Sequence, residues 1–318
     1  MALSLDSIVH AVKSAASARS KSKDSVRVAV YVDGSATPFL VDAVREALVP
    51  QTTAAVVRVE RLTDEPAPVL DGTDIVLVLT CGSNHLERAV GSLLAAGAPV
   101  AVLAESSVEV PFIKRDTRML SLISATDRTH LLGQLSRWIL DHTEKETVFA
   151  ANFPFLRVAA GSRAISTCTA ANTLTAVLPW PRGADFPTMT GAQIDMLFQL
   201  AGIYGKSIDR DRAYEVAAVV ALALALRKVS RTVSEGAGRA APLVNAAIAG
   251  AGTWCMGLGL SALYEHDVDY APLNAMLDTL AGTVRKVAAP VVSAASKAAG
   301  RAADQAPAPS RGAAARPA

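Results

Sequence analysis

The first half of the chain alternates short apolar runs with amphipathic segments. The runs are rich in valine, isoleucine and leucine, as in strands buried on both faces of a parallel sheet. The segments between them carry apolar residues at helical spacing. This alternation predicts βαβ units in an α/β domain with a parallel sheet. The predicted strands are residues 26–32, 54–62, 74–80, 99–105 and 119–124, and the predicted helices are residues 38–49, 85–96 and 129–142.

After about residue 149 the pattern contains no further strands and becomes helical. The fold class we predict is therefore an α/β N-terminal domain, GTPase-like or flavodoxin-like, followed by an all-α hydrophobic helical domain. The predicted helices of the second part are rich in alanine, leucine, valine and glycine, and they cover residues 156–178, 191–205, 212–231 and 240–265.

Four segments follow from these patterns. Residues 1–23 are predicted to form an amphipathic helix and a linker, because apolar residues recur on one side of the helix. The α/β domain covers residues 24–148 and the helical domain covers residues 149–288. Residues 289–318 are rich in alanine, proline and arginine and contain little that can be buried, which predicts a disordered tail.

The composition favours extensive burial or contact with lipid. Hydrophobic residues make up 51% of the chain and charged residues only 19%, whereas about a quarter of an average soluble domain is charged. The formal net charge of +2 is too small to indicate a nucleic-acid partner. The cysteines, Cys81, Cys168 and Cys255, lack the spacing of a disulfide framework or a zinc site. We expect no metal and no cofactor.

The turn after the first predicted strand lies where open α/β sheets form their ligand crevice. Its residues Asp33, Gly34 and Ser35 are our candidate ligand-binding residues. A phosphate loop also needs a second glycine, a lysine and a following hydroxyl. This turn has neither the lysine nor the second glycine, and Pro38 lacks a backbone N–H group. The sequence therefore predicts that a nucleoside triphosphate is not bound in the usual way.

No catalytic residue is predicted in either half. Cys81 and His85 follow the third predicted strand, on the crevice side. A nucleophilic pair also needs an orienting group and an oxyanion site. No local pattern for either accompanies them, so we interpret the two residues as incidental neighbours.

The order of the predicted elements resembles that of Era-like and TrmE-like GTPase domains. Residues 69–82 resemble the strand before the metal-contacting turn, and residues 99–107 resemble the strand that carries the guanine-reading Asn-Lys-x-Asp. Ser124–Ala125 matches the Ser-Ala dipeptide of these proteins. The guanine motif itself is absent, because residues 104–106 read Ala-Glu-Ser. The resemblance implies a degenerate, nucleotide-incompetent GTPase-like domain, and a flavodoxin-like domain remains the alternative.

Residues 178–205 read LPWPRGADFPTMTGAQIDMLFQLAGIYG. Proline ends the preceding helix, a capping box of Thr190 and Gln193 starts the next one, and Gly205 ends it. Arg182 and Asp185 are expected in the turn between these helices, where they can pair with each other or cap backbone groups. The segment resembles the pattern LPxPGADxPxLTALQxxMLxxLAxLYG of the hydrophobic helical domain that follows many bacterial Era-like GTPases and occurs in YcjF-like inner-membrane proteins.

The matching positions define the motif, and two positions depart from the pattern. Arg182 is one residue more than the pattern has, and Gly191 replaces an alanine. Residues 247–266 resemble the glycine-rich second element of the same family. The resemblance implies a GTPase-associated, membrane-linked helical module without established chemistry. The motif residues are Pro179, Pro181, Arg182, Gly183, Asp185, Pro187, Thr190, Gln193, Tyr204 and Gly205.

Residues 240–264 carry no charge and are long enough to cross a hydrocarbon core of about 30 Å. Within them, small residues recur every fourth position and would let another helix approach closely. A compact soluble bundle is the alternative. The basic loop at residues 227–239 is typical of cytoplasmic loops. The small residues are Ala249, Thr253, Gly257 and Ser261.

These patterns together predict a non-catalytic adaptor that docks on a membrane or on an unknown protein partner. Its expected location is the cytoplasmic side of the inner membrane, with the cytoplasm as the alternative. Two other functions remain open. One is a residual GTP- or ATP-binding NTPase with an atypical phosphate loop, and the other is a small-ligand-binding regulator that uses the crevice near Asp33, Gly34 and Cys81. A nucleic-acid partner is not expected, and homo-oligomerisation remains open.

Overall fold

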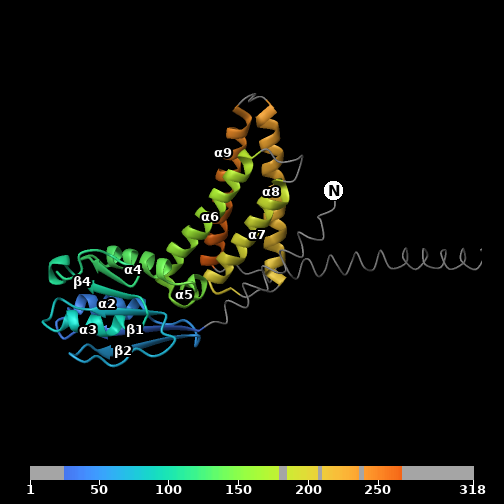
Figure 1. Ribbon diagram of the computed structural model, residues 1–318. Helices are drawn as coiled ribbons and strands as arrows, with labels where there is room; N and C mark the ends of the chain where they lie inside the picture. Colours follow the sequence, from blue (N-terminus) through green and yellow to red (C-terminus); the bar gives the residue numbers. More distant parts are fainter. Residues whose placement is uncertain (1–24, 179–184, 207–209, 236–239, 267–318) are drawn as a thin grey trace, which may run out of the picture. The chain divides into compact units, whose positions relative to one another are not determined.

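The computed structural model describes residues 25–178, 185–206, 210–235 and 240–266 (Figure 1). A parallel sheet with helices comes first and a helical region follows, which confirms the predicted fold class. The predicted N-terminal helix and C-terminal tail lie outside the described residues. So do four motif residues, Pro179, Pro181, Arg182 and Gly183.

The sheet has five strands in the order β2-β1-β3-β4-β5, and every neighbouring pair is parallel. This is the order of flavodoxin-like doubly wound proteins. β3 and β4 are buried along their whole length, as their unbroken runs of apolar residues predicted. The predicted strands are confirmed, with bounds of Val26–Val32 (β1), Ala55–Arg61 (β2), Ile75–Leu79 (β3), Val100–Ala104 (β4) and Leu120–Ser124 (β5).

Helices cover both faces of the sheet. α2 (Pro38–Ala47) and α4 (Arg128–His142) pack on the face that carries Val28 and Val30, whereas α3 (Leu86–Leu94) packs on the opposite face with Tyr31. α2 begins where Thr37 accepts a hydrogen bond from the Leu40 N–H group, and Pro38 occupies the first helical position. The loop that precedes α2 therefore ends in a capped helix start.

A short helix that the sequence pattern did not predict, α5 (Glu146–Asn152), follows α4. Its Phe149 and the adjacent Phe153 are fully buried in a core that continues from the sheet into the helical region. Asn152 accepts hydrogen bonds from the Gln51 N–H group and from the Thr52 hydroxyl. The α/β part and the helical region are thus joined by apolar packing as well as by hydrogen bonds.

The helical region contains four long helices in its described part (Figure 1). α6 packs against α7 and most extensively against α9, while α8 packs against α9 and α7. Short 3-10 turns occur at Ser107–Glu109 (η1) and Pro154–Leu156 (η2). The long helices are Arg157–Val177 (α6), Asp185–Ile203 (α7), Arg210–Glu235 (α8) and Ala241–Glu265 (α9).

The predicted capping box of Thr190 and Gln193 is wrong. α7 begins at Asp185, so both residues lie inside the helix rather than at its start. Pro187 does not prevent this, because the N–H groups of a first helical turn have no partner within the helix. A carboxylate at the first position also interacts favourably with the helix dipole. Downstream, Gly205 follows α7 with a positive φ of 68°.

Among the described residues, α9 is the helix long and apolar enough to cross a membrane. Only 22% of its most apolar 18-residue window is buried within the protein. Thr253 on this helix is fully buried, and Gly257 lies directly against Ile165 of α6. α9 therefore presents small residues to the other helices and exposes much of its remaining surface.

Candidate functional site

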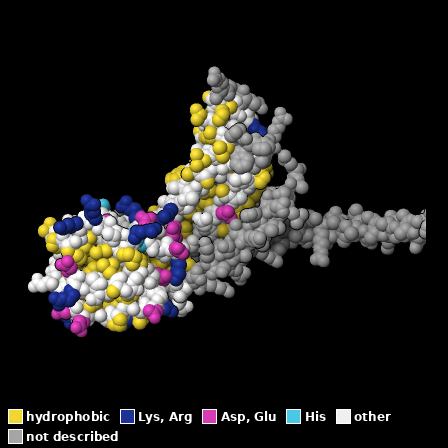
Figure 2. Space-filling model, viewed as in Figure 1, with side chains coloured by type: hydrophobic (Ala, Val, Ile, Leu, Met, Phe, Trp, Pro, Cys, Tyr) yellow, Lys and Arg dark blue, Asp and Glu magenta, His cyan; other side chains and the backbone are white. Residues whose placement is uncertain are grey.

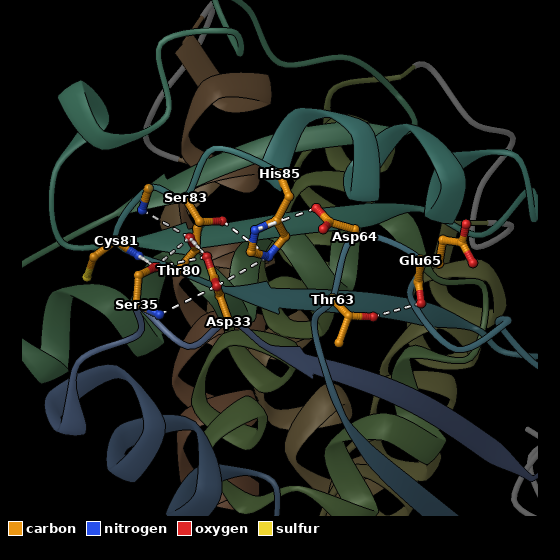
Figure 3. Close-up of polar contacts among 10 residues, drawn as sticks. Asp33, Ser35, Thr63, Asp64, Glu65, Thr80, Cys81, Ser83 and His85 are labelled. Atoms are coloured by element: carbon orange, nitrogen blue, oxygen red, sulfur yellow. Dashed lines mark hydrogen bonds and ion pairs between the residues drawn. The ribbon is translucent and has the colours of Figure 1, made fainter.

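The carboxyl ends of β1 and β3 lie next to each other in the sheet, where ligand crevices form in doubly wound folds. Asp33 and Ser35 follow β1, and Thr80, Cys81, Ser83 and His85 follow β3. Figure 3 shows Ser35, Thr80, Ser83 and His85 around the Asp33 carboxylate, whereas the Cys81 side chain points away from it. The structure thus brings together predicted Asp33 and Ser35 with residues that the sequence analysis did not select.

The Asp33 carboxylate is buried and well supplied with hydrogen bonds. Asp33 is only 3% exposed. The Ser35 and Thr80 hydroxyls donate to Oδ2 at 2.8 and 2.7 Å, and the Ser35 N–H group donates to Oδ1 at 3.5 Å. Burial raises the pKa of Asp33, but hydrogen bonds from Thr80, Ser83 and Ser35 outweigh it and bring the pKa below its usual value. Asp33 is therefore an ionised carboxylate at neutral pH.

Backbone groups behind the two hydroxyls fix the direction of these bonds. The Cys81 N–H group donates to Ser35 Oγ at 3.0 Å, and the Gly82 N–H group donates to Thr80 Oγ1 at 3.0 Å. Each hydroxyl thus accepts from the backbone and donates to the carboxylate. Gly82 has a φ of 87°, and a Cβ there would lie 2.6 Å from the Glu109 carbonyl oxygen. This close approach requires glycine at the turn.

His85 lies beside this cluster without forming a catalytic triad. Its Nε2 atom is 3.6 Å from Asp33 Oδ1 and 3.4 Å from Ser83 Oγ, while Nδ1 is 4.0 Å from Asp64. In a Ser-His-Asp triad the hydroxyl and a buried carboxylate contact different ring nitrogens. Here buried Asp33 and Ser83 share Nε2, and the carboxylate near Nδ1, Asp64, is 72% exposed and too distant for a hydrogen bond. The ring can position the loop after β3, but it cannot relay a proton from Ser83 to Asp33.

Cys81 is a poor nucleophile in this environment. Burial raises the pKa of its thiol, and the nearby carboxylates of Glu109 and Glu105 raise it further. A thiol acts as a nucleophile in its deprotonated form, which these surroundings disfavour. Within the described ranges, no group of three or more His, Cys, Asp and Glu residues could hold a metal ion.

The loop offers few groups to a phosphate. Asp33 already accepts from the Ser35 N–H group, and Glu105 accepts a hydrogen bond from the Thr37 hydroxyl at the start of α2. Phosphate binding at a helix start depends on free N–H groups and a favourable field. Both carboxylates oppose an anion here. A Cβ added to Gly34 would meet nothing within 4 Å, so space at that position is not restricted.

The sequence analysis missed Thr80 and Ser83. A signal for both was present, because Thr80 ends the third predicted strand and Ser83 closely follows it, as Asp33 follows the first. The carboxyl ends of parallel neighbouring strands meet at one edge of a sheet. What the sequence did not reveal was that β1 and β3 are neighbours, since strand order depends on how the helices cross over the sheet.

The described motif residues of the helical region occupy different environments. Asp185 is 3.3 Å from Arg227 of α8 in an ion pair. Thr190 and Gln193 are buried, and Gln193 Nε2 donates to Thr253 Oγ1 at 3.0 Å. The Thr253 hydroxyl also accepts from the Asn172 amide at 3.0 Å. Polar side chains of α6, α7 and α9 thus meet inside the bundle.

Fold and site together define a doubly wound α/β domain whose crevice holds a hydrogen-bonded carboxylate, followed by a hydrophobic helical region. No family model, curated protein or solved structure matches the chain. The resemblance of residues 178–205 to YcjF-like proteins therefore remains a prediction.

Replacing Asp33 with asparagine is expected to lower the free energy of unfolding at pH 7 by about 1–3 kcal/mol, because buried hydroxyls lose a charged acceptor. The folded pKa of Asp33 lies below the unfolded value of about 3.9. The stabilisation is therefore present above about pH 4 and is lost as the pH falls through the folded pKa. Urea unfolding should show the two proteins converging at acidic pH.

The matched control is Asp42→Asn, which removes an exposed carboxylate that forms an ion pair with exposed Arg45. Asp42→Asn should change the free energy of unfolding by close to zero at pH 7 and at acidic pH, since exposed ion pairs contribute little. A constant difference between wild type and Asp33→Asn from neutral to acidic pH would show that folding does not lower the pKa of Asp33.

Proposed function

We propose that this chain is a non-catalytic adaptor whose helical region docks on a lipid bilayer and whose α/β domain does not bind nucleotides. The observation that carries the proposal is α9, which is long and apolar enough to cross a membrane while only 22% of its most apolar window is buried. A core helix of a soluble protein would be mostly covered by its neighbours. An apolar helix that its own fold leaves uncovered is suited to lipid.

Large exposed apolar residues of α9 and of other helices form this apolar surface. On α9, Leu243 is 71% exposed, and Trp254 and Leu258 are also exposed. Figure 2 shows hydrophobic side chains along the helical region with few charges between them. Large exposed apolar patches mark interaction sites. The other large apolar residues exposed in this region are Val158, Leu174 and Val177 on α6, Leu178 directly after it, and Leu222, Leu224, Val229 and Val233 on α8.

Charge favours a bilayer as the partner. Exposed Lys228 and Arg231 lie on α8 among the apolar residues Val229 and Val233. Basic residues beside an apolar surface are attracted to anionic headgroups, which are concentrated on cytoplasmic membrane surfaces. This charge and the predicted resemblance to YcjF-like inner-membrane proteins support our proposal that docking occurs on the cytoplasmic side of the inner membrane.

The site at Asp33 supports the absence of nucleotide binding. Its carboxylate holds the hydroxyl and N–H donors at the end of β1, and Glu105 accepts from Thr37 where α2 begins. A triphosphate placed there would meet two carboxylates and no lysine. We therefore assign the α/β domain a scaffolding role within the adaptor.

Flotation of the full chain with vesicles of mixed phosphatidylglycerol and phosphatidylcholine tests the docking. The protein should float with the vesicles, and the double variant Leu243→Lys/Leu258→Lys should reduce the floated fraction at least tenfold, because lysine opposes burial in hydrocarbon. The matched control is Val56→Lys/Val59→Lys, which alters two exposed valines of β2 and should float normally.

Membrane docking would be contradicted if the wild-type protein stayed in solution, or if both double variants floated to the same extent. Titration of the same protein with Mg²⁺ and GTP or ATP should show no binding. Micromolar affinity would instead favour the NTPase. Retention in membranes washed with carbonate would place α9 in the hydrocarbon, and release would limit docking to the surface.

A further inference from the structure

A cavity of about 400 Å³ lies between the long helices, lined by residues of α6, α7, α8 and α9 together with Leu178. Pockets for small molecules usually measure about 300–1,000 Å³. One wall is apolar and includes Phe186, Met189, Leu226 and Ile248. This cavity is far along the chain from the Asp33 site and shares no residue with it.

Two buried residues of the lining have unsatisfied oxygens. Thr190 and Gln193 are 5% and 3% exposed. Thr190 Oγ1 and Gln193 Oε1 have no hydrogen-bond partner in the part of the chain that the structure describes. The amide nitrogen of Gln193 already donates to Thr253. Buried polar atoms without partners are rare in native proteins, and each one calls for an explanation such as a bound molecule.

The edge of the cavity next to Phe186 is polar and cationic. Arg227 and Arg231 line it together with Ser230, Ser234 and Asn245. Arg227 is 3.3 Å from Asp185 and lies over the Phe186 ring at 5.0 Å. Two arginines face a single carboxylate in this lining, so the edge carries excess positive charge. Arginine is well suited to bind carboxylates and phosphates.

We propose that this cavity binds an anionic amphiphile with a hydroxyl group, of the acylglycerol phosphate class. The acyl chain lies along the apolar wall, and the anionic group meets Arg231 and Arg227. A hydroxyl of the ligand donates to Gln193 Oε1, which can only accept, and Thr190 pairs with a second polar atom of the ligand. The proposal does not require α9 to enter a bilayer.

The test is equilibrium dialysis of the full chain with radiolabelled decanoylglycerol phosphate below its micelle-forming concentration. Wild type should bind it, with at least tenfold weaker binding of decanoylglycerol, which lacks the anion, and of glycerol phosphate, which lacks the chain. Thr190→Val and Arg231→Gln should each weaken binding at least fivefold. Thr190→Val should not lower the thermal midpoint of the unliganded protein, since it removes an unsatisfied oxygen.

Two matched variants separate binding from general effects. Thr169 also carries a buried hydroxyl without a partner among the described residues but does not line the cavity. Lys228 is an exposed cation of α8 outside the lining. Thr169→Val and Lys228→Gln should therefore bind like wild type. Absence of binding, equal binding of decanoylglycerol, or equal losses in the matched variants would each overturn the proposal.

Discussion

Glu215→Ala is expected to lower the free energy of unfolding by about 3–5 kcal/mol, the usual cost of removing one partner of a buried ion pair. Glu215 lies on α8 and is 4% exposed, and Arg212 on the same helix is 7% exposed. The Arg212 guanidinium donates to both Glu215 oxygens, at 2.6 and 2.5 Å. The variant leaves the guanidinium in place without this carboxylate.

The same carboxylate connects α8 with α9. The Tyr264 hydroxyl donates to Glu215 Oε2 at 2.6 Å, and the Arg212 guanidinium lies 5.0 Å from the centre of the Tyr264 ring. Tyr264→Phe should therefore cost less, about 1.5–3 kcal/mol, the usual contribution of a hydrogen bond to a charged group. Because both substitutions act on one cluster, the double variant should lose less than the sum of the single losses.

Urea unfolding of the full chain measures these differences. Glu265→Ala is the matched control, because Glu265 is exposed near the end of α9, and its effect should lie within about 0.5 kcal/mol of zero. A loss below about 1 kcal/mol for Glu215→Ala would mean that the Arg212–Glu215 pair is accessible to water, since exposed pairs contribute little. Additive losses in the double variant would show that Tyr264 and Glu215 act separately.

The α/β domain could be predicted from its sequence because its apolar runs have the length and composition of buried strands. β3 and β4 consist of apolar residues alone and are buried throughout. α5 could not be predicted in the same way. It spans only Glu146–Asn152, which is too short for a helical period to be visible. Its position depends on the packing of Phe149 in the core.

The motif around Thr190 shows how a local signal can be misread. A threonine followed three residues later by glutamine is typical of a helix start, yet α7 begins earlier, at Asp185. Thr190 and Gln193 are buried against the other helices, so they contribute to packing inside the bundle and not to the helix cap. Strand order likewise lies beyond local patterns, so Asp33 and Ser35 could be selected from the sequence, whereas their contact with Thr80 could not.

Gly257→Ala is expected to lower the free energy of unfolding by about 1–3 kcal/mol, the usual cost of overpacking a core. A Cβ at Gly257 would lie 2.6 Å from Ile165 Cγ1 and 2.9 Å from Ile165 Cγ2. Ile165 is itself 2% exposed, so its branched side chain has little room to move. α9 and α6 would have to separate.

Gly259 on the same helix provides the matched control. A Cβ there would meet nothing within 4 Å, so Gly259→Ala should stabilise the protein by about 0.4–1 kcal/mol through its higher helix propensity. In urea unfolding, Gly257→Ala should therefore lower the free energy of unfolding and Gly259→Ala should raise it. Ile165→Ala combined with Gly257→Ala should lose less than the sum of the two single losses, because alanine at residue 165 removes the carbons that crowd the new Cβ. Equal stabilisation by both glycine substitutions would show that α6 and α9 do not pack closely at Gly257. The exposed surface of α9 would then be larger than it is in the bundle described here.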